Sequence, residues 1–131
     1  QSARQDPRVC LLAITKSDGG EHIGNIKIGP ANEFHRFADV SYFIGARDSW
    51  GCGFASEALA AVVSFAFRDC GLHRLQAGVY ECNGASAAVL RKCGFIDEGC
   101  QRSKFRSDGG FDSHLLFGIL ASEWRSLAEL T

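Results

Sequence analysis

The stretch SWGCGFASEAL, residues 49–59, places two glycines directly before an apolar pattern that has the period of a helix. Gly51 and Gly53 allow a ligand to approach the backbone because neither residue carries a Cβ atom. The first turn of the helix that follows offers free N–H groups and the positive end of the helix dipole, and Ser56 adds a hydroxyl group. The stretch therefore favours a site for a phosphate or pyrophosphate. A tight, well-capped turn that holds no ligand is the alternative.

Two familiar phosphate motifs do not fit this stretch. A dinucleotide-binding fingerprint requires a third glycine at the position that Ser56 occupies. A P-loop requires a Gly-Lys-Ser/Thr sequence, which is absent here.

The composition is typical of one soluble globular domain, which we place at residues 1–131. The chain is 46% hydrophobic and 22% charged, and its formal net charge of −1 predicts neither a nucleic-acid partner nor a membrane partner. No apolar run approaches the roughly 18–20 residues that span a bilayer. Residues 1–10 lack the pattern of a signal peptide.

The cysteines indicate a reducing compartment rather than a disulfide framework. No C-x-x-C pair occurs, and no histidine stands at a zinc-ligand spacing from a cysteine, so no metal site is predicted. We therefore expect free thiols and a cytoplasmic protein. The six cysteines are Cys10, Cys52, Cys70, Cys82, Cys93 and Cys100.

The hydrophobic periods predict an α+β (mixed α/β) fold with a mostly antiparallel, twisted central sheet and one β–α–β crossover. Residues 29–38 read as a loop. Asn83 is expected to cap the second helix, Gly71 and Gly94 to follow the first and second helices, and Ser122 to cap the last. The expected strands are residues 9–15, 22–29, 38–45, 73–80, 95–105 and 111–120, and the expected helices are residues 54–69, 84–92 and 121–130.

Three stretches together resemble the GNAT acetyltransferase superfamily, and most closely its RimJ/RimL-like branch. WGCGFASEAL at residues 50–59 resembles the family pattern W-G-x-G-Y-A-T-E-A-L of the acetyl-CoA loop. GLHRLQAGVYECNGASAAVLRKCGF at residues 71–95 and LLFGILASEW at residues 115–124 extend the resemblance, which covers residues 38–124. It implies an acyl-CoA N-acyltransferase fold with helices on both faces of the sheet. It also implies that acetyl-CoA is the co-substrate and that a primary amine is the acceptor.

The resemblance also implies where acetyl-CoA binds. The amides of the glycine turn would hold the pyrophosphate, and the pantetheine arm would pair with the exposed edge of the preceding strand. A splay between this strand and residues 73–81 would open the slot for the thioester. The implied cofactor-binding residues are Phe43, Ile44, Gly45, Trp50, Gly51, Cys52, Gly53, Phe54, Ala55, Ser56, Asn83, Ser86 and Lys92.

Two catalytic roles follow from the same resemblance. The amine must lose a proton before it attacks, and a carboxylate can accept that proton, directly or through water. Asp39 is the first candidate for this base, although it also fits a solvated acid at the end of a strand without a catalytic role. Glu33 is the weaker candidate. Ser86 stands where the family places a donor near the departing sulfur, although Asn83 and Ser86 also fit a simple helix cap. His114 and the other three histidines receive no role.

The sequence departs from the family pattern at the loop and at the front. Asp48 stands where the family has Gln or Arg, and Cys52 replaces a frequent Lys or Arg. Only eight residues precede the first expected strand, where the family usually has a strand and two helices. We therefore expect an N-terminally short domain that self-associates as a homodimer through the hairpin at residues 9–28, and a monomer in which residues 1–8 cover the first strand is the alternative. An acetyl-CoA-binding module without activity and a structural domain are the alternatives, and the acceptor is left open among protein N-termini and small-molecule amines.

Overall fold

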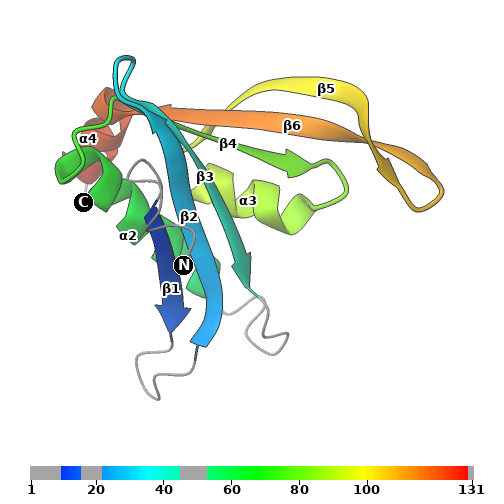
Figure 1. The fold of residues 1–131 in the computed structure, drawn as a ribbon, viewed down its shortest axis with the longest axis horizontal. Coiled ribbons are helices and arrows are strands. Elements are labelled where there is room, and N and C mark those ends of the chain that lie inside the picture. The colour runs from blue at the N-terminus through cyan, green and yellow to red at the C-terminus, as the bar shows by residue number, and fades with distance from the viewer. Residues whose placement is uncertain (1–9, 16–21, 45–52, 130–131) are drawn as a thin grey trace.

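The computed structural model describes residues 10–15, 22–44 and 53–129. A six-stranded sheet runs in the order β1-β2-β3-β4-β6-β5, with β3 and β4 parallel and every other neighbouring pair antiparallel. The predicted α+β class and the β–α–β crossover are confirmed (Figure 1). The strands are β1 (Cys10–Thr15), β2 (His22–Asn32), β3 (Phe37–Ile44), β4 (Arg74–Tyr80), β5 (Ile96–Ser107) and β6 (Gly110–Leu120).

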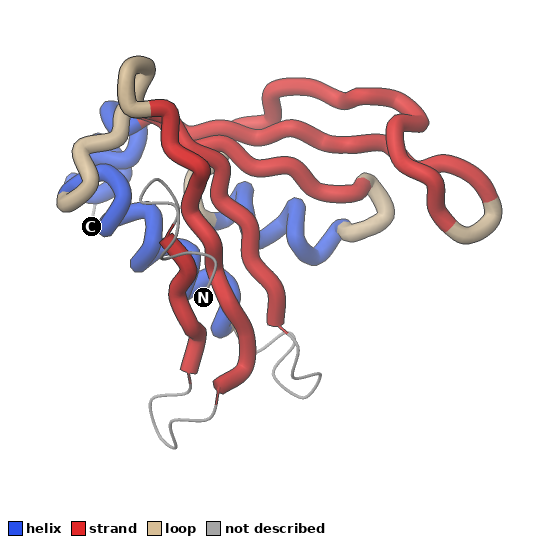
Figure 2. Tube along the Cα trace, in the orientation of Figure 1, coloured by secondary structure: helices blue, strands red, loops and turns tan. Residues whose placement is uncertain are grey.

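Three helices cover one face of the sheet: α2 (Phe54–Arg68), α3 (Gly84–Lys92) and α4 (Ala121–Glu129) (Figures 1 and 2). Leu59 of α2 and Leu90 of α3 are fully buried in the same core as Leu75 of β4. The ring of Trp124 in α4 lies 5.8 Å from the ring of Phe67 in α2. Helices on both faces were expected, but the three helices of the described residues all pack on this one. The opposite face, which we call the open face, carries the polar side chains of the strands.

Strands β3 and β4 separate soon after they pair. Their register joins Phe37 to Arg74, Ala38 to Leu75 and Asp39 to Gln76, and no further pair follows in the described residues. In Figure 1 the two strands diverge from this point. The predicted splay is therefore present, and the backbone of β4 beyond Gln76 has no β3 partner.

Strand β2 runs further than the sequence predicted. The expected loop at 29–38 is wrong over most of its length, because β2 continues to Asn32 and β3 begins at Phe37. The β2–β3 register shifts between Ile28 and Ala31, on either side of Pro30. A bulge at this place removes the need for the N–H group that proline lacks, so pairing resumes beyond it.

The helix ends follow their capping signals with two exceptions. Asn83 caps α3 as expected, because its Oδ1 atom accepts a hydrogen bond from the backbone N–H of Ser86 at 3.2 Å. Gly71 has a φ of 68° but lies two residues beyond the cap residue of α2, Asp69. Ser122 does not cap α4 but lies inside it, and the carboxylate of Glu123 accepts from the backbone N–H of Leu120 at 2.9 Å.

Each described helix is too short or too polar to cross a lipid bilayer.

Candidate active site

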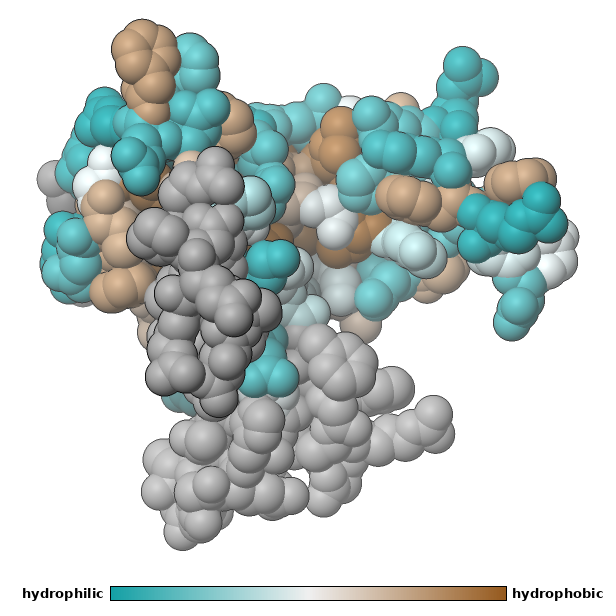
Figure 3. All heavy atoms as spheres, in the orientation of Figure 1, coloured by the Kyte–Doolittle hydropathy of each residue, from teal (hydrophilic) through white to brown (hydrophobic). Residues whose placement is uncertain are grey.

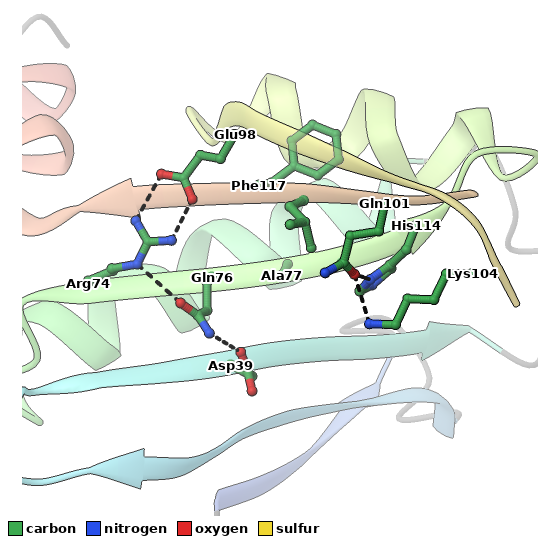
Figure 4. A pocket seen from close by; sticks show the side chains of 11 residues that line it. Asp39, Arg74, Gln76, Ala77, Glu98, Gln101, Lys104, His114 and Phe117 are labelled. Atoms are coloured by element: carbon green, nitrogen blue, oxygen red, sulfur yellow. Dashed lines mark hydrogen bonds and ion pairs between the residues drawn. The ribbon is translucent and has the colours of Figure 1, made fainter.

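A polar cavity of about 280 Å³ lies on the open face, beside the point where β3 and β4 separate. Figure 4 shows the polar side chains of β3, β4, β5 and β6 along the cavity, with the helices behind the sheet. Its lining residues are Asp39, Arg74, Gln76, Ala77, Gly78, Glu98, Gln101, Lys104, His114, Leu116 and Phe117.

A chain of polar contacts crosses one end of the cavity (Figure 4). Gln76 Nε2 donates to Asp39 Oδ1 at 2.8 Å, and Arg74 Nε donates to Gln76 Oε1 at 3.2 Å. The guanidinium of Arg74 also forms a two-pronged ion pair with Glu98, in which Nη1 lies 2.9 Å from Oε2. Asp39 is thereby held at the last paired position of β3 by a side chain from β4.

The Arg74–Glu98 pair is charged over a wide pH range. Its hydrogen bonds raise the pKa of Arg74 and lower the pKa of Glu98. The charges of the two groups offset each other. The carboxylate of Asp39 is therefore the acid in this part of the cavity that no cationic side chain neutralises directly.

A second cluster lies at the other end of the cavity and consists of His114, Gln101 and Lys104 (Figure 4). Lys104 Nζ donates to Gln101 Oε1 at 2.8 Å, and His114 Nδ1 lies 3.0 Å from the same oxygen. Partial burial and the nearby charge of Lys104 lower the pKa of His114. The imidazole is therefore mostly neutral at pH 7.

Gly78 makes room for this imidazole. A Cβ atom added to Gly78 would lie 2.0 Å from His114 Nε2, far inside contact distance. Gly78 has no left-handed backbone angle. Its lack of a side chain therefore serves the close approach of His114 and not a turn.

The first turn of α2 lies on the other side of the sheet. Gly53 precedes the helix with a φ of 83°, and its carbonyl accepts from the N–H of Glu57 at 3.0 Å. Ala55 and Ser56 are half-buried in this turn. Gly45, Trp50, Gly51 and Cys52 lie outside the described residues, and of Phe43, Ile44 and Phe54 only the backbone is described.

Helix α3 brings the remaining predicted residues to the same side as α2. The Ser86 carbonyl accepts from the hydroxyl of Tyr42 at 3.2 Å, and burial raises the pKa of that hydroxyl. Cys93 Sγ donates to the carbonyl of Ser56 at 3.4 Å. This contact joins the end of α3 to the start of α2. Lys92 is exposed and directly precedes Cys93 in the sequence.

The predicted residues therefore form two groups on opposite faces of the sheet. The helix face carries Ser56, Asn83, Ser86 and Lys92, and the open face carries Asp39. The splay of β3 from β4 is the place where the two groups approach. Glu33 lies in the turn between β2 and β3 and does not line the cavity.

Sequence reasoning missed most of the cavity. The polar face of β4 offered a signal, because Arg74, Gln76 and Gly78 alternate with Leu75 and Ala77. His114 occupies the corresponding face of β6, since it pairs with Tyr80. The sequence gives no such signal for Glu98 and Lys104. Both lie where the pairing of β5 with β6 shifts its register.

The thiols of Cys82, Cys93 and Cys100 are free in the described part of the chain, in line with the expectation of free thiols. In the same part of the chain, no three His, Cys, Asp or Glu side chains are grouped in a way that could hold a metal ion.

Comparison with known families gives one matching domain. The model described as Acetyltransferase (GNAT) domain matches residues 1–96 of this chain.

Several bacterial proteins are similar to this chain. An uncharacterised N-acetyltransferase of Bacillus subtilis, YoaA, is 37% identical over 105 residues, which is 80% of this chain and 59% of that protein. The spermidine N(1)-acetyltransferase of Vibrio cholerae is 26% identical over 107 residues, which is 82% of this chain and 61% of that protein. The chain thus spans about three-fifths of the length of these curated relatives.

Solved structures show the same fold. The spermidine N-acetyltransferase of Vibrio cholerae, in complex with CoA and spermine, superposes with a TM-score of 0.86 at 22% identity. The match covers 95% of this chain and 72% of that chain.

Proposed function

Because the chain belongs to the GNAT acetyltransferase domain family, we propose that it transfers the acetyl group of acetyl-CoA to a primary amine. One observation carries this proposal: β3 and β4 part beside a polar cavity on one face and beside two helix N-termini on the other. The splay offers an unpaired strand edge to the amide-bearing pantetheine arm. The cavity offers a carboxylate to the amine.

Acetyl-CoA is proposed to bind on the helix side. The first N–H groups of α2, around Gly53, Ala55 and Ser56, are suited to the pyrophosphate. Asn83, which caps α3, and Ser86 and Lys92 of α3 are proposed along the pantetheine arm and near the phosphates. The same proposed binding site includes Phe43, Ile44, Gly45, Trp50, Gly51, Cys52 and Phe54.

We expect Gly53→Val to weaken acetyl-CoA binding by at least about tenfold in calorimetry, because a branched side chain would stand where the phosphate approaches. The substitution also strains the backbone, since the φ of Gly53 is 83°. Gly71→Val is the matched control, because Gly71 has a φ of 68° near the opposite end of the same helix. Equal acetyl-CoA affinity in the two folded variants would refute the placement of the pyrophosphate.

Transfer is proposed to use Asp39 and Ser86. Asp39 accepts the proton of the incoming ammonium, directly or through water, and so creates the neutral amine that attacks. The nitrogen then bonds to the thioester carbon and the carbon–sulfur bond breaks. The hydroxyl of Ser86 is proposed to donate toward the departing thiolate.

The acceptor is proposed to be a protein N-terminus or a small-molecule amine, as in a RimJ/RimL-like enzyme. Release of free thiol from acetyl-CoA over a panel of peptides, polyamines, amino sugars and aminoglycosides tests both the reaction and the acceptor. Acetyl-CoA binding without thiol release for any amine would favour the alternative, a non-catalytic acetyl-CoA-binding module. We also propose the cytoplasm as the compartment, because the free thiols of Cys82, Cys93 and Cys100 suit a reducing environment.

Self-association is proposed through the hairpin at residues 9–28. Strand β1 lies at the edge of the sheet, and an edge strand can pair with a second copy of itself. We expect light scattering at micromolar concentration to give the mass of a dimer. Leu11→Pro should return the mass to that of a monomer if β1 is the contact, because proline lacks the backbone N–H group that strand pairing uses. A monomer at every concentration would contradict this proposal.

A further inference from the structure

We propose that His114 is a second proton acceptor in the acetyl transfer, through its unprotonated Nε2 atom. This inference rests on the function proposed above. It assigns a role in the reaction to a side chain to which the sequence motifs assign none.

The hydrogen bonds fix which nitrogen of His114 carries the proton. The ammonium of Lys104 can only donate, so the Gln101 atom that it contacts at 2.8 Å is the amide oxygen. That oxygen can only accept, so His114 Nδ1, at 3.0 Å, must donate to it. In a neutral imidazole the proton then resides on Nδ1, and Nε2 presents a lone pair.

The lone pair lies in the cavity without a partner from the described residues. No described side chain or backbone group makes a hydrogen bond to Nε2. The atom lies over Gly78, where any Cβ would collide with it. The edge of the imidazole against Phe105 and the contact with Gln101 hold the ring in this orientation.

His114 and Asp39 share the same cavity from opposite ends. Asp39 contacts Gln76, whereas His114 Nε2 lies over Gly78, two residues further along β4. Two residues of a strand span about 6–7 Å, so the two acceptors enter the cavity at successive positions on the open face of β4. Both groups border the splay at which the thioester is proposed to arrive.

The transfer removes two protons from the nitrogen, and a second acceptor takes one of them in this proposal. An ammonium nitrogen carries three protons and the nitrogen of the amide product carries one, so two protons must leave. Asp39 takes the first from the ammonium, and the neutral nitrogen attacks the thioester carbon. His114 Nε2 takes the second from the positively charged nitrogen of the tetrahedral intermediate. The carbon–sulfur bond then breaks, one proton ends on the thiolate, and the other passes to solvent over the open face.

The charges around His114 favour its neutral form. Lys104 of β5 faces it directly, and Arg74 of β4 with Glu98 of β5 forms a pair whose charges cancel. Asp39 of β3 lies across the cavity. The pKa of His114 is lowered from the ordinary value of 6.5. The lone pair of Nε2 is therefore free to accept a proton above this lowered pKa, and the imidazole becomes protonated as the pH falls through it.

The test compares His114→Gln and Gly78→Ala with a control, His35→Gln. His35 is exposed in the turn between β2 and β3, outside the cavity. With an amine found by thiol release, we expect His114→Gln to lower kcat by about 10- to 100-fold and to remove an acid limb of the pH profile below pH 6.5. Acetyl-CoA affinity and the His35→Gln rate should stay unchanged. Gly78→Ala should give the same kinetic defect with His114 still present, because its Cβ displaces the imidazole.

Nitrogen NMR of histidine-labelled protein gives a readout that does not depend on turnover. It should show the proton of neutral His114 on Nδ1. A proton on Nε2, or a kcat and pH profile of His114→Gln equal to those of the unaltered chain, would overturn the inference while leaving the acetyltransferase function intact. An unaltered chain that binds acetyl-CoA but releases no thiol with any amine would instead overturn the proposed function, and this inference with it. Circular dichroism of each variant separates unfolding from a specific loss of rate.

Discussion

Asp39→Asn is expected to lower turnover by about 10²- to 10⁴-fold, the usual scale for loss of a general base. The substitution keeps the shape of the side chain and an oxygen that can accept from Gln76 Nε2, which lies 2.8 Å from Asp39 Oδ1. It removes the negative charge and the proton-accepting oxygen. The affinity for acetyl-CoA should barely change, because the residues proposed to bind it lie on the helix face. A thiol-release assay measures the turnover, and calorimetry on the same preparation measures the affinity for acetyl-CoA.

The control for this prediction is Ser41→Ala. Ser41 is exposed at the next position of β3 on the open face, beyond the last residue paired with β4. The rate of this variant should stay close to that of the unaltered chain. A near-normal rate for Asp39→Asn would remove Asp39 from the proton transfer and leave that step to His114 or to solvent.

Phe117→Ala is expected to lower the free energy of unfolding by about 3–5 kcal/mol, the range for truncating a buried aromatic side chain. Phe117 is 1% exposed and stands in β6 between Ala77 of β4 and Asp97 of β5. The guanidinium of Arg91 in α3 lies 5.3 Å from the centre of its ring. The substitution therefore leaves a void between the sheet and α3, directly beneath the cavity. Urea unfolding followed by fluorescence measures the loss.

Phe111→Ala is the matched control on the same strand. Phe111 is 61% exposed, so its truncation removes little buried surface and should cost less than about 1 kcal/mol. A similar loss in both variants would show that Phe117 does not hold the core in the way described here.

The helices could be predicted from the sequence because their signals are local. The prediction for residues 84–92 matches α3 at both ends, since Asn83 caps it and Gly94 follows it with a φ of 98°. The alternation of apolar and polar residues likewise located β4. The order of these elements was enough to predict one crossover in a mostly antiparallel sheet, which the structure confirms.

The cavity could not be predicted, because its parts come from irregular pairing. The β5–β6 register shifts between Asp97 and Gly99 and again between Gln101 and Phe105. The first shift accompanies the contact of Glu98 with Arg74, and the second accompanies the contact of Lys104 with Gln101. A simple alternation of faces along β5 does not predict these positions, since each added residue reverses the faces that follow.

Charged and apolar residues also alternate irregularly on the surface of the β5–β6 hairpin (Figure 3). Ile96 is 51% exposed at its start, and the rings of Tyr80 and Phe105 stack at 5.0 Å further along. A hydrophobic pattern read from such a strand indicates no single buried face. This is why the sequence located the strand but not the side chains that it contributes to the cavity.

The placement of the two groups of residues on opposite faces of the sheet has a consequence for inhibition. Under the proposed function, donor and acceptor occupy separate volumes that meet only where β3 leaves β4. Neither substrate then has to depart before the other arrives, and the acetyl group passes directly between them without resting on the protein. A compound that joins an amine to the sulfur of CoA would pass through this opening and occupy both volumes together. It would bind more tightly than either substrate alone, because it makes the contacts of both and loses translational freedom once instead of twice.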